Sequence, residues 1–232
     1  LILDMDAQGH VEKSLCQHIV SRRGKTSDVL LSTEGADILD TVVDTSYERL
    51  HITGADSALN EAESLMSTRI GKEFILKDAL EFTRSHYDVI LIDCPPNLGN
   101  LTLNALVAAD YVLVPCDASP LAIQGVNDIV ETIVTINERL NRGLDLLGIL
   151  VTRMDGRNTT INEVALETLR ERFGDLVLES TIGVNTSLAK AQFEGVSIFD
   201  YDGQSRAAKH YKQLAEEVSQ LLNSAGTVAA VS

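Results

Sequence analysis

Acidic residues stand directly after two apolar runs of the chain. Asp4 follows Leu1-Ile2-Leu3, with Asp6 two residues later. Asp93 follows Val89-Ile90-Leu91-Ile92. Carboxylates at strand ends can hold Mg²⁺, directly or through water, beside phosphate groups. Asp is also a common turn and helix-capping residue, and this structural alternative stays open for any single position. Because the pattern occurs twice, the sequence favours a magnesium-dependent phosphate site.

The short apolar runs alternate with longer segments of helical periodicity. Continuous runs indicate strands covered on both faces, and they are Leu1–Leu3, Val89–Ile92, Tyr111–Val114, Leu146–Val151 and Leu176–Ile182. Apolar residues at three- and four-residue spacing predict helices over Asn60–Ile70, Glu73–His86, Leu121–Leu140, Thr160–Phe173 and Arg206–Leu222. The alternation predicts an α/β fold with an open, doubly wound, mostly parallel sheet and helices on both faces. We expect one domain over residues 1–222 and a flexible tail over residues 223–232.

The predicted sheet brings further polar residues to the same edge as the acids. Ligands of such sheets bind outside the carboxyl ends of the strands. Besides the three acids, those ends hold Cys94, Pro95, Pro96, Asp117, Thr152 and Arg153. We therefore expect the ligand at this edge.

Composition and charge exclude several classes of protein. The 232 residues are 44% hydrophobic and 23% charged, which excludes disorder for most of the chain. No run of about 18 apolar residues predicts a membrane span, and the first residues do not resemble a signal peptide. The net charge of −15 repels nucleic acid unless a local basic patch exists. This acidity is typical of proteins in a salt-rich cytoplasm, and it also occurs in ordinary acidic soluble proteins.

The three cysteines predict no disulfide framework. Their odd number and the lack of a CxxC pair indicate a reducing cytoplasm. Cys94 and Cys116 each end an apolar run, and we interpret them as small buried hydrophobic residues.

Long segments of the chain resemble ParA-type partition ATPases. LILDMDAQGH is similar to the family pattern hhhDhDPQGN, in which h is apolar. YDVILIDCPPNLGNLTLNALVAADYVLVPCDASPLAIQGV resembles the family's switch II segment and the strand after it. The similarity continues through LLGILVTRMDGRNT and IFDYDGQSRAAKHYKQLAEEV, and thus runs from Leu1 to about Leu222. It implies a P-loop NTPase-like fold that uses ATP and Mg²⁺.

The resemblance assigns roles to the acids. It implies that Asp93 holds the Mg²⁺ shell and that Asp6 orients or polarises the attacking water. Asp4 would support Asp6 from the strand end. Pro95 and Pro96 would belong to the nucleotide-binding loop that senses the γ-phosphate.

Two further positions match stretches that bind the nucleotide base in the family. They are Arg153 after Thr152, and Asn185 in the stretch IGVN. One departure from the family pattern is Ala7, which replaces the usual Pro and loosens its loop.

The family's P-loop, a KGGxGKT-type stretch upstream of the DxD segment, has no counterpart in the sequence. Gly24-Lys25-Thr26 lies after that segment and lacks the upstream glycines, so we interpret it as a loop. We expect the first strand and the P-loop to be missing from this chain. Truncation is favoured over a protein that has shed hydrolysis. In either case these residues alone should hydrolyse ATP negligibly.

The DNA-binding stretch of the family is altered here. Relatives often have IPRNxRLSEA where this chain has IGVNTSLAKA, so Val184 and Ser187 replace arginines. Lys190 restores one positive charge. Arg206, Lys209 and Lys212 share one face of a predicted helix. This face is either an ordinary solvated surface or a weak contact to DNA phosphates.

The resemblance implies a ParA-type ATPase of plasmid or chromosome partitioning. It would form an ATP-dependent homodimer that binds DNA without sequence specificity, in a nucleoid-associated cytoplasmic location. A ParB-like centromere-binding protein would stimulate hydrolysis. The alternatives are a non-hydrolysing regulatory or dimerisation module and a MinD-like positioning ATPase. The last ten residues carry no Lys, Arg or aromatic side chain, so we expect no membrane anchor.

Overall fold

A computed structural model describes residues 1–21 and 24–229. Its contacts divide the chain into two compact units. Unit 1 comprises Leu1–Ala109 and Ala191–Ser197, and unit 2 comprises Asp110–Lys190 and Ile198–Ser232. The single domain predicted for residues 1–222 stays a prediction. Within the described residues, no helix is long and apolar enough to cross a membrane.

Unit 1 contains a four-stranded sheet in the order β2-β3-β1-β4. Its strands are β1 (Ile2–Asp4), β2 (Val42–Asp44), β3 (His51–Thr53) and β4 (Leu91–Asp93). β1 runs parallel to β3 and β4, whereas β2 and β3 form an antiparallel pair. The sequence analysis missed β2 and β3, because strands of three residues show too little periodicity to detect. The mostly parallel α/β fold is nevertheless confirmed.

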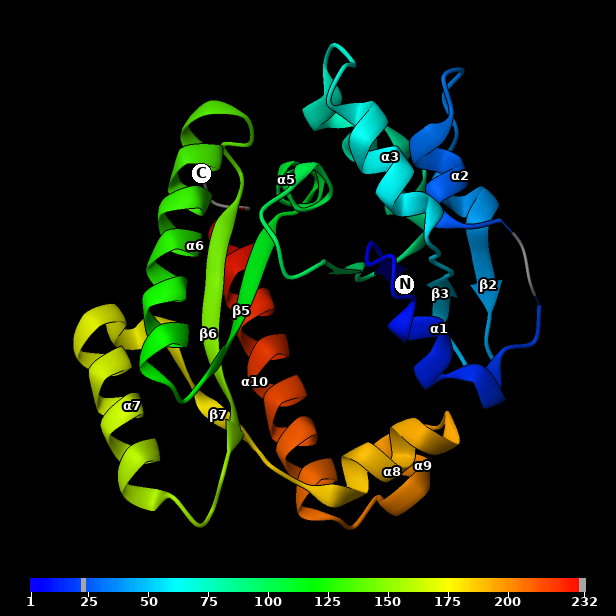
Figure 1. The fold of residues 1–232 in the computed structure, drawn as a ribbon. Coiled ribbons are helices and arrows are strands. Elements are labelled where there is room, and N and C mark those ends of the chain that lie inside the picture. Colours follow the sequence, from blue (N-terminus) through cyan, green and yellow to red (C-terminus); the bar gives the residue numbers. More distant parts are fainter. Residues whose placement is uncertain (22–23, 230–232) are drawn as a thin grey trace. The chain divides into compact units, whose positions relative to one another are not determined.

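Helices pack against this sheet and enclose an aliphatic core. The α-helices of unit 1 are α1 (His10–Ser14), α2 (Thr26–Leu31), α3 (Ala58–Met66), α4 (Ile75–Ala79) and α5 (Asn100–Ala108). Short 3₁₀ turns are η1 (Cys16–His18), η2 (Ile38–Thr41), η3 (Lys72–Phe74) and η4 (Thr83–His86). Fully buried core side chains include Leu3, Met5, Leu30, Ile52, Leu59, Met66 and Leu76. Figure 1 shows α2 and α3 beside β2 and β3.

The single helix predicted over Glu73–His86 is wrong. The chain forms η3, α4 and η4 there instead. Thr83 turns inward and is fully buried, and its hydroxyl donates a hydrogen bond to Asp37 Oδ1. This hydrogen bond to a residue distant in the chain fixes Thr83 inside unit 1, where the 3₁₀ turn η4 replaces a continuous helix.

The second correction concerns β4, which was expected to be covered on both faces. Val89 and Leu91 are 48% and 58% exposed. β4 ends the sheet of unit 1, and in the described residues no strand pairs with its outer edge. Ile90 and Ile92 pack against the core of unit 1, whereas Val89 and Leu91 alternate with them and point to the opposite, exposed face.

Unit 2 contains a parallel sheet in the order β5-β6-β7. The strands are β5 (Tyr111–Asp117), β6 (Asp145–Met154) and β7 (Val177–Gly183). The helical segments are α6 (Pro120–Arg139), α7 (Thr159–Phe173), η5 (Gly174–Leu176), α8 (Thr186–Glu194), α9 (Ile198–Asp202) and α10 (Arg206–Ala229). In Figure 1, α6 and α7 lie on one side of this sheet and α10 lies on the other. All three strands match runs predicted from the sequence.

The last helix continues beyond the end predicted at Leu222. α10 reaches Ala229, and the Ser224 hydroxyl donates to the carbonyls of Gln220 and Leu221 at 2.9 Å. Helical structure therefore extends into the segment predicted as a tail. Residues 230–232 of that segment lie outside the described residues.

We expect Asn104→Ala to lower the free energy of unfolding by about 1–3 kcal/mol. Asn104 is fully buried in α5, and its Oδ1 accepts a hydrogen bond from Leu76 N at 3.1 Å. Its Nδ2 donates to the carbonyls of Lys72 at 2.8 Å and Asn100 at 2.9 Å. The alanine leaves these buried backbone groups without their partner. Urea unfolding measures the effect, with exposed Asn60→Ala on α3 as a control; equal midpoints for both variants would contradict it.

Candidate active site

The carboxyl ends of β1 and β4 bring the predicted acids together in unit 1. Asp4 and Asp93 are register partners in the β1–β4 pair. Met5 N donates to Asp93 O at 2.8 Å, which carries the pairing one residue past the strand. Asp6 follows directly, so Asp4, Asp6 and Asp93 share one sheet edge, as the sequence predicted.

Asp4 organises the loop that carries Asp6. The residue is fully buried, and its Oδ1 accepts a hydrogen bond from Asp6 N at 3.0 Å. Its Oδ2 accepts one from Val11 N at 3.2 Å. Burial raises the pKa of Asp4, the two amide hydrogen bonds oppose the rise, and the charges of Asp93 and Asp6 add to it. With both oxygens engaged by the backbone, Asp4 is a positioning residue.

Thr53, which the sequence analysis missed, binds the backbone of Asp4, and Thr26 in turn contacts Thr53. Thr53 Oγ1 accepts a hydrogen bond from Asp4 N at 3.0 Å. The Thr26 and Thr53 hydroxyl oxygens lie 2.8 Å apart, and both residues are fully buried. Thr26 Oγ1 also contacts Gly54 O at 3.2 Å. Thr53 ends the undetected strand β3, so no signal in the sequence linked it to Asp4.

The segment Gly24-Lys25-Thr26, predicted to be a loop, leads directly into α2. Thr26 is the first helical residue, and Lys25 forms a β-bridge with Gly54. The Lys25 ammonium pairs with Glu12. The lysine and the buried threonine hydroxyl are thus both engaged inside unit 1, which argues against a displaced phosphate loop.

Asp6 and Asp93 are the acids of this edge that reach solvent. Asp6 Oδ1 accepts a hydrogen bond from Gln8 N at 3.0 Å, and the carboxylate is partly exposed. Desolvation and the nearby charge of Asp6 raise the pKa of Asp93, and His10 opposes the rise. Two mutually repelling carboxylates fit a divalent cation.

The acids at this edge suit Mg²⁺ better than a metal ion whose ligands must all come from protein side chains. Within the described residues, no three His, Cys, Asp or Glu side chains converge as metal ligands. Mg²⁺ keeps several waters and takes one or two carboxylates together with substrate phosphates. Asp93 would supply such a carboxylate, with Asp6 close enough to face a water of the metal shell.

Asp93→Asn should stabilise the metal-free protein at pH 7, by less than about 1 kcal/mol because Asp93 is exposed. The raised pKa of Asp93 means that its ionisation destabilises the folded state. The wild-type free energy of unfolding therefore carries no penalty from Asp93 at low pH, where this carboxyl is protonated. The penalty appears as the pH rises through the pKa of Asp93 in the folded state. The difference between variant and wild type should vanish below about pH 3.9. Thermal unfolding across pH measures this, with Asp78→Asn on α4 as the matched charge control; a pH-independent difference would contradict it.

The loop after β4 is held from α5 and α3. The Thr102 hydroxyl donates to Asn97 O at 2.6 Å, next to Pro95 and Pro96. Gly99 precedes α5, and a Cβ at this position would overlap Glu63 Oε1 on α3. The Glu63 carboxylate thus lies directly over Gly99, and a larger residue here would have to displace this side chain.

Burial disfavours the thiolate form of both Cys94 and Cys116, the two cysteines predicted to be hydrophobic. Cys94 is partly buried, and desolvation together with the charge of Asp93 raises its pKa to about 12. Cys116 is buried, and desolvation raises its pKa as well. The prediction of a buried cysteine is confirmed for Cys116.

In unit 2, Arg153 and Asn185 lie at the carboxyl ends of neighbouring strands. The β6–β7 register shifts between Val151 and Met154, and Arg153 has a φ of 54°. A non-glycine residue with this conformation at a strand end is typical of functional sites. The Arg153 guanidinium lies 3.8 Å from Asp117 Oδ2. Asn185 Oδ1 accepts a hydrogen bond from Ser187 N at 2.8 Å, so this oxygen helps to begin α8.

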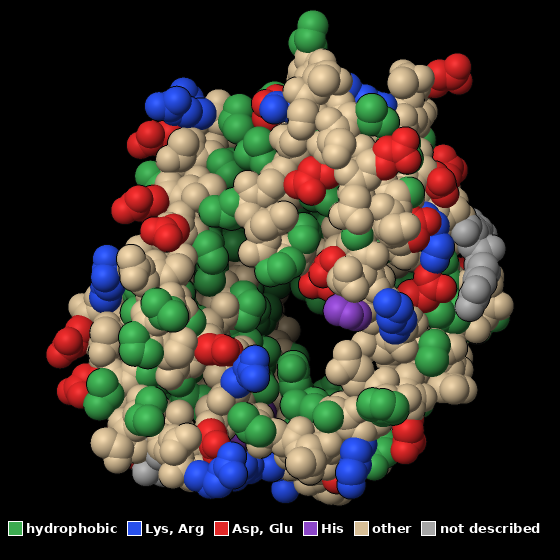
Figure 2. Space-filling model, viewed as in Figure 1, with side chains coloured by type: hydrophobic (Ala, Val, Ile, Leu, Met, Phe, Trp, Pro, Cys, Tyr) green, Lys and Arg blue, Asp and Glu red, His purple; other side chains and the backbone are tan. Residues whose placement is uncertain are grey.

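The predicted basic residues also belong to unit 2. Lys190 lies on α8, and Arg206, Lys209 and Lys212 lie on α10; all four side chains are exposed. Ala207 and Ala208, between two of these residues, are buried. Figure 2 shows Lys and Arg side chains at its lower edge, where α8 and α10 begin. Their exposure fits both interpretations of this face, a solvated surface and a DNA contact.

A family model described as an AAA domain (AAA_31) matches residues 1–146. The sporulation initiation inhibitor protein Soj of Bacillus subtilis is 35% identical over 219 residues, covering 94% of this chain and 85% of Soj. The chromosome partitioning protein ParA of Caulobacter vibrioides is 34% identical and covers 94% of this chain and 81% of its own length.

The chain is also similar to proteins whose structures have been solved. A Mycobacterium smegmatis protein described as cobyrinic acid a,c-diamide synthase, with bound ADP and magnesium, is 32% identical to this chain. Its TM-score is 0.70, and the match covers 89% of this chain and 83% of that one. Apo McdA from Cyanothece matches with a TM-score of 0.80 at 18% identity over 95% of this chain and 86% of its own, which supports the fold.

The fold and the acidic strand ends define a nucleotide-binding α/β protein of the P-loop NTPase class. The chain belongs to the ParA/MinD family of ATPases.

Proposed function

We propose that the chain is a ParA-type partition ATPase that uses Mg²⁺-ATP. The observation that carries the proposal is the pairing of β1 with β4, which places Asp6 and Asp93 at one edge. Asp93 would bind the Mg²⁺ shell and Asp6 would orient the attacking water. When bound, the metal ion would neutralise charge that develops on the phosphates.

The phosphates of a nucleotide need hydrogen-bond donors in addition to these acids. A glycine-rich loop supplies backbone N–H groups and a lysine in this class of protein. The outer edge of β4 is free of a partner strand in the described residues. A strand seated there would deliver its following loop beside Asp6 and Asp93, because parallel strands end at a common edge.

In the proposed cycle, ATP joins two copies of the chain and the dimer binds DNA without sequence specificity. A ParB-like centromere-binding protein stimulates hydrolysis, which releases the dimer. Arg153 and Asn185 would contact the base of the nucleotide. Lys190, Arg206, Lys209 and Lys212 would contact DNA phosphates, where positive charge provides affinity without reading sequence.

The test uses the chain with a glycine-rich phosphate-binding strand supplied ahead of Leu1. We expect Mg²⁺-dependent ATP binding and dimerisation, measured by calorimetry and light scattering. Asp93→Ala should weaken Mg²⁺-ATP binding, whereas Asp78→Ala on α4 should bind like the parent. Equal ATP affinity with and without Mg²⁺ would contradict the assignment of Asp93.

A regulatory or dimerisation module of the same family is the second candidate. Dimerisation of the 232-residue chain without nucleotide would favour it. Monomeric behaviour without nucleotide, together with ATP-dependent dimers of the supplemented chain, would favour the ATPase.

A further inference from the structure

A partly buried ion pair adjoins the candidate active site in unit 1, and the proposed chemistry of the site does not use it. The Lys25 ammonium, at the start of α2, pairs with the Glu12 carboxylate on α1. The two side chains are 32% and 17% exposed. Glu12 directly follows Val11, whose N–H binds the Asp4 carboxylate. The ion pair therefore connects α2 to the helix that follows Asp6.

The two charged groups meet over the segment that follows β3. Lys25 forms a parallel β-bridge with Gly54, and Thr26 N donates to Gly54 O at 2.9 Å. A Cβ on Gly54 would lie 2.6 Å from Lys25 Nζ and 2.7 Å from Glu12 Oε2. A larger residue at this position would therefore displace both ends of the ion pair.

The turn that carries Asp6 packs against the next residue of the same segment. Gly9 N donates to Asp6 O at 2.9 Å, which closes this turn. Gly9 has a φ of 61°, and a Cβ on it would lie 3.0 Å from Ala55 O. Gly54 and Ala55 thus contact both the start of α2 and the turn of Asp6.

The short helix α1 depends on contacts of this kind. It has five residues, none of them buried, and its first turn has no side-chain cap. A helix of this length is not stable by itself in water. Loss of the Lys25 ammonium would remove the cation that neutralises the Glu12 carboxylate where solvent reaches it poorly. We expect α1 to shift in response, and the turn of Asp6 to shift with it.

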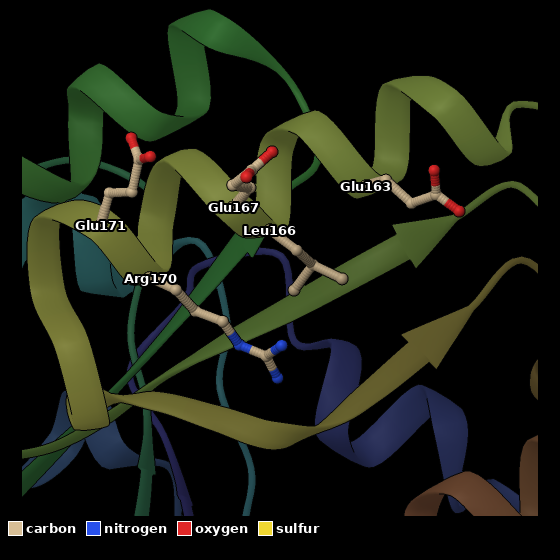
Figure 3. A pocket seen from close by; sticks show the side chains of 5 residues that line it. All are labelled: Glu163, Leu166, Glu167, Arg170 and Glu171. Atoms are coloured by element: carbon tan, nitrogen blue, oxygen red, sulfur yellow. The ribbon is translucent and has the colours of Figure 1, made fainter.

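Two other ion pairs of the chain are more exposed. Arg49 and Asp88 in unit 1 are 77% and 84% exposed, and they precede β3 and β4, away from the acids at the carboxyl ends. Arg170 and Glu179 in unit 2 are exposed as well. Figure 3 shows the Arg170 side chain pointing from α7 toward the strands. Exposed pairs of this kind contribute little to stability, so the pair of Arg49 and Asp88 offers a matched control.

We propose that Lys25 and Glu12 are a positioning pair, which holds the turn of Asp6 so that its carboxylate faces the attacking water. The effect on hydrolysis rests on the proposed function, whereas the effect on the turn does not. The N–H groups of Asp6 and Val11 bind the Asp4 carboxylate at 3.0 and 3.2 Å, so their hydrogen exchange reports whether the turn is held.

The first experiment measures this exchange by NMR in the 232-residue chain, without nucleotide. Lys25→Met and Glu12→Gln should each accelerate exchange of the Asp6 and Val11 N–H groups at least about fivefold. The double variant should exchange about as fast as the faster single variant, because the two residues act as one pair. Lys25→Arg keeps the positive charge and should exchange within about twofold of wild type.

Two controls separate the turn from the stability of unit 1. Asp88→Asn breaks the exposed ion pair and should leave the exchange of both N–H groups within about twofold of wild type. The N–H of Leu76, which donates to Asn104 Oδ1 at 3.1 Å, is the internal reference. Unfolding of the whole unit would accelerate exchange at Leu76 as much as at the turn.

The second experiment measures ATP hydrolysis in the chain supplemented with a phosphate-binding strand. Lys25→Met should lower kcat at least about fivefold and leave KM for Mg²⁺-ATP within about twofold, because only the acid that orients the water is misplaced. Lys25→Arg should restore kcat. Gly54→Ala keeps both charges but displaces them, and it should lower kcat in the same way if Lys25→Met does not fold.

The two experiments decide the proposal separately from the proposed function. Faster exchange confined to the turn, with a lower kcat, an unchanged KM and rescue by Lys25→Arg, supports it. Exchange equal to wild type, equal acceleration in Asp88→Asn, or a kcat equal to that of the parent would each overturn it. A supplemented parent that hydrolyses no ATP would reject the ATPase assignment, and the exchange rates would then decide whether the pair holds the turn.

Discussion

Asp6→Ala should slow ATP hydrolysis by about 10²–10⁴-fold in a chain that carries a phosphate-binding loop, while leaving Mg²⁺-ATP binding largely unchanged. Asp6 is the partly exposed acid of the edge, and its backbone N–H is fixed by Asp4 Oδ1 at 3.0 Å. A carboxylate in this position can orient or polarise a water without binding the metal directly. The ATP-bound dimer should therefore accumulate. Single-turnover hydrolysis and light scattering measure the two effects.

Asp4→Ala is the informative comparison, because the two acids have different surroundings. Removing the buried Asp4 carboxylate leaves the N–H groups of Asp6 and Val11 without acceptors, at a cost of about 1–3 kcal/mol each. Asp4→Ala should therefore lose folding stability as well as activity, whereas Asp6→Ala should keep its stability. Unchanged turnover in Asp6→Ala would remove that residue from the mechanism. A large loss of stability in the same variant would assign it a structural role.

The elements that sequence reasoning found are those with long or repeated patterns. The apolar runs ending at Asp93 and near Asp117 predicted β4 and β5, and the helical periodicity over Leu121–Leu140 matches α6. β2 and β3 have three residues each, and a hairpin of that length offers no period to measure. The interrupted helix after Lys72 depends on the buried Thr83 hydroxyl bound to Asp37. A contact that distant in the chain leaves no local signal.

In the candidate site, too, the spacing of residues along the chain predicted some features, whereas others depend on contacts between residues distant in the sequence. The DxD spacing and the run before Asp93 correctly predicted that three acids meet at one sheet edge. The sequence did not predict that Asp4 is buried or that both of its carboxylate oxygens accept hydrogen bonds from backbone amides. These contacts form because residues 5–11 fold back over Asp4. Thr53 was missed because it reaches Asp4 from β3, and Thr26 because it contacts Thr53 from α2. Residue types identified the chemistry, and tertiary contacts separated the positioning acid from the solvent-facing ones.

Arg206→Ala combined with Lys209→Ala should weaken binding to duplex DNA of any sequence. Both side chains are exposed near the start of α10, in a chain whose net charge of −15 repels DNA overall. Removing one cation that binds a phosphate should reduce the slope of log K against log salt by about 0.9, so the double variant should flatten it by roughly two units. Anisotropy titrations with ATP present, over a range of salt concentrations, measure the slope.

The matched control replaces two basic residues away from this face, Lys72→Ala with Lys77→Ala, which removes the same charge from unit 1. If both double variants flatten the slope equally, the effect comes from net charge and the α10 face is an ordinary solvated surface. ATP affinity measured on the same samples separates a DNA contact from an indirect effect on the nucleotide. A parent protein that binds no DNA at low salt with ATP would point instead to Val184 and Ser187, where the family more often has arginine. In that case the lost activity lies in the start of α8, and a regulatory or positioning role becomes the better account of the chain.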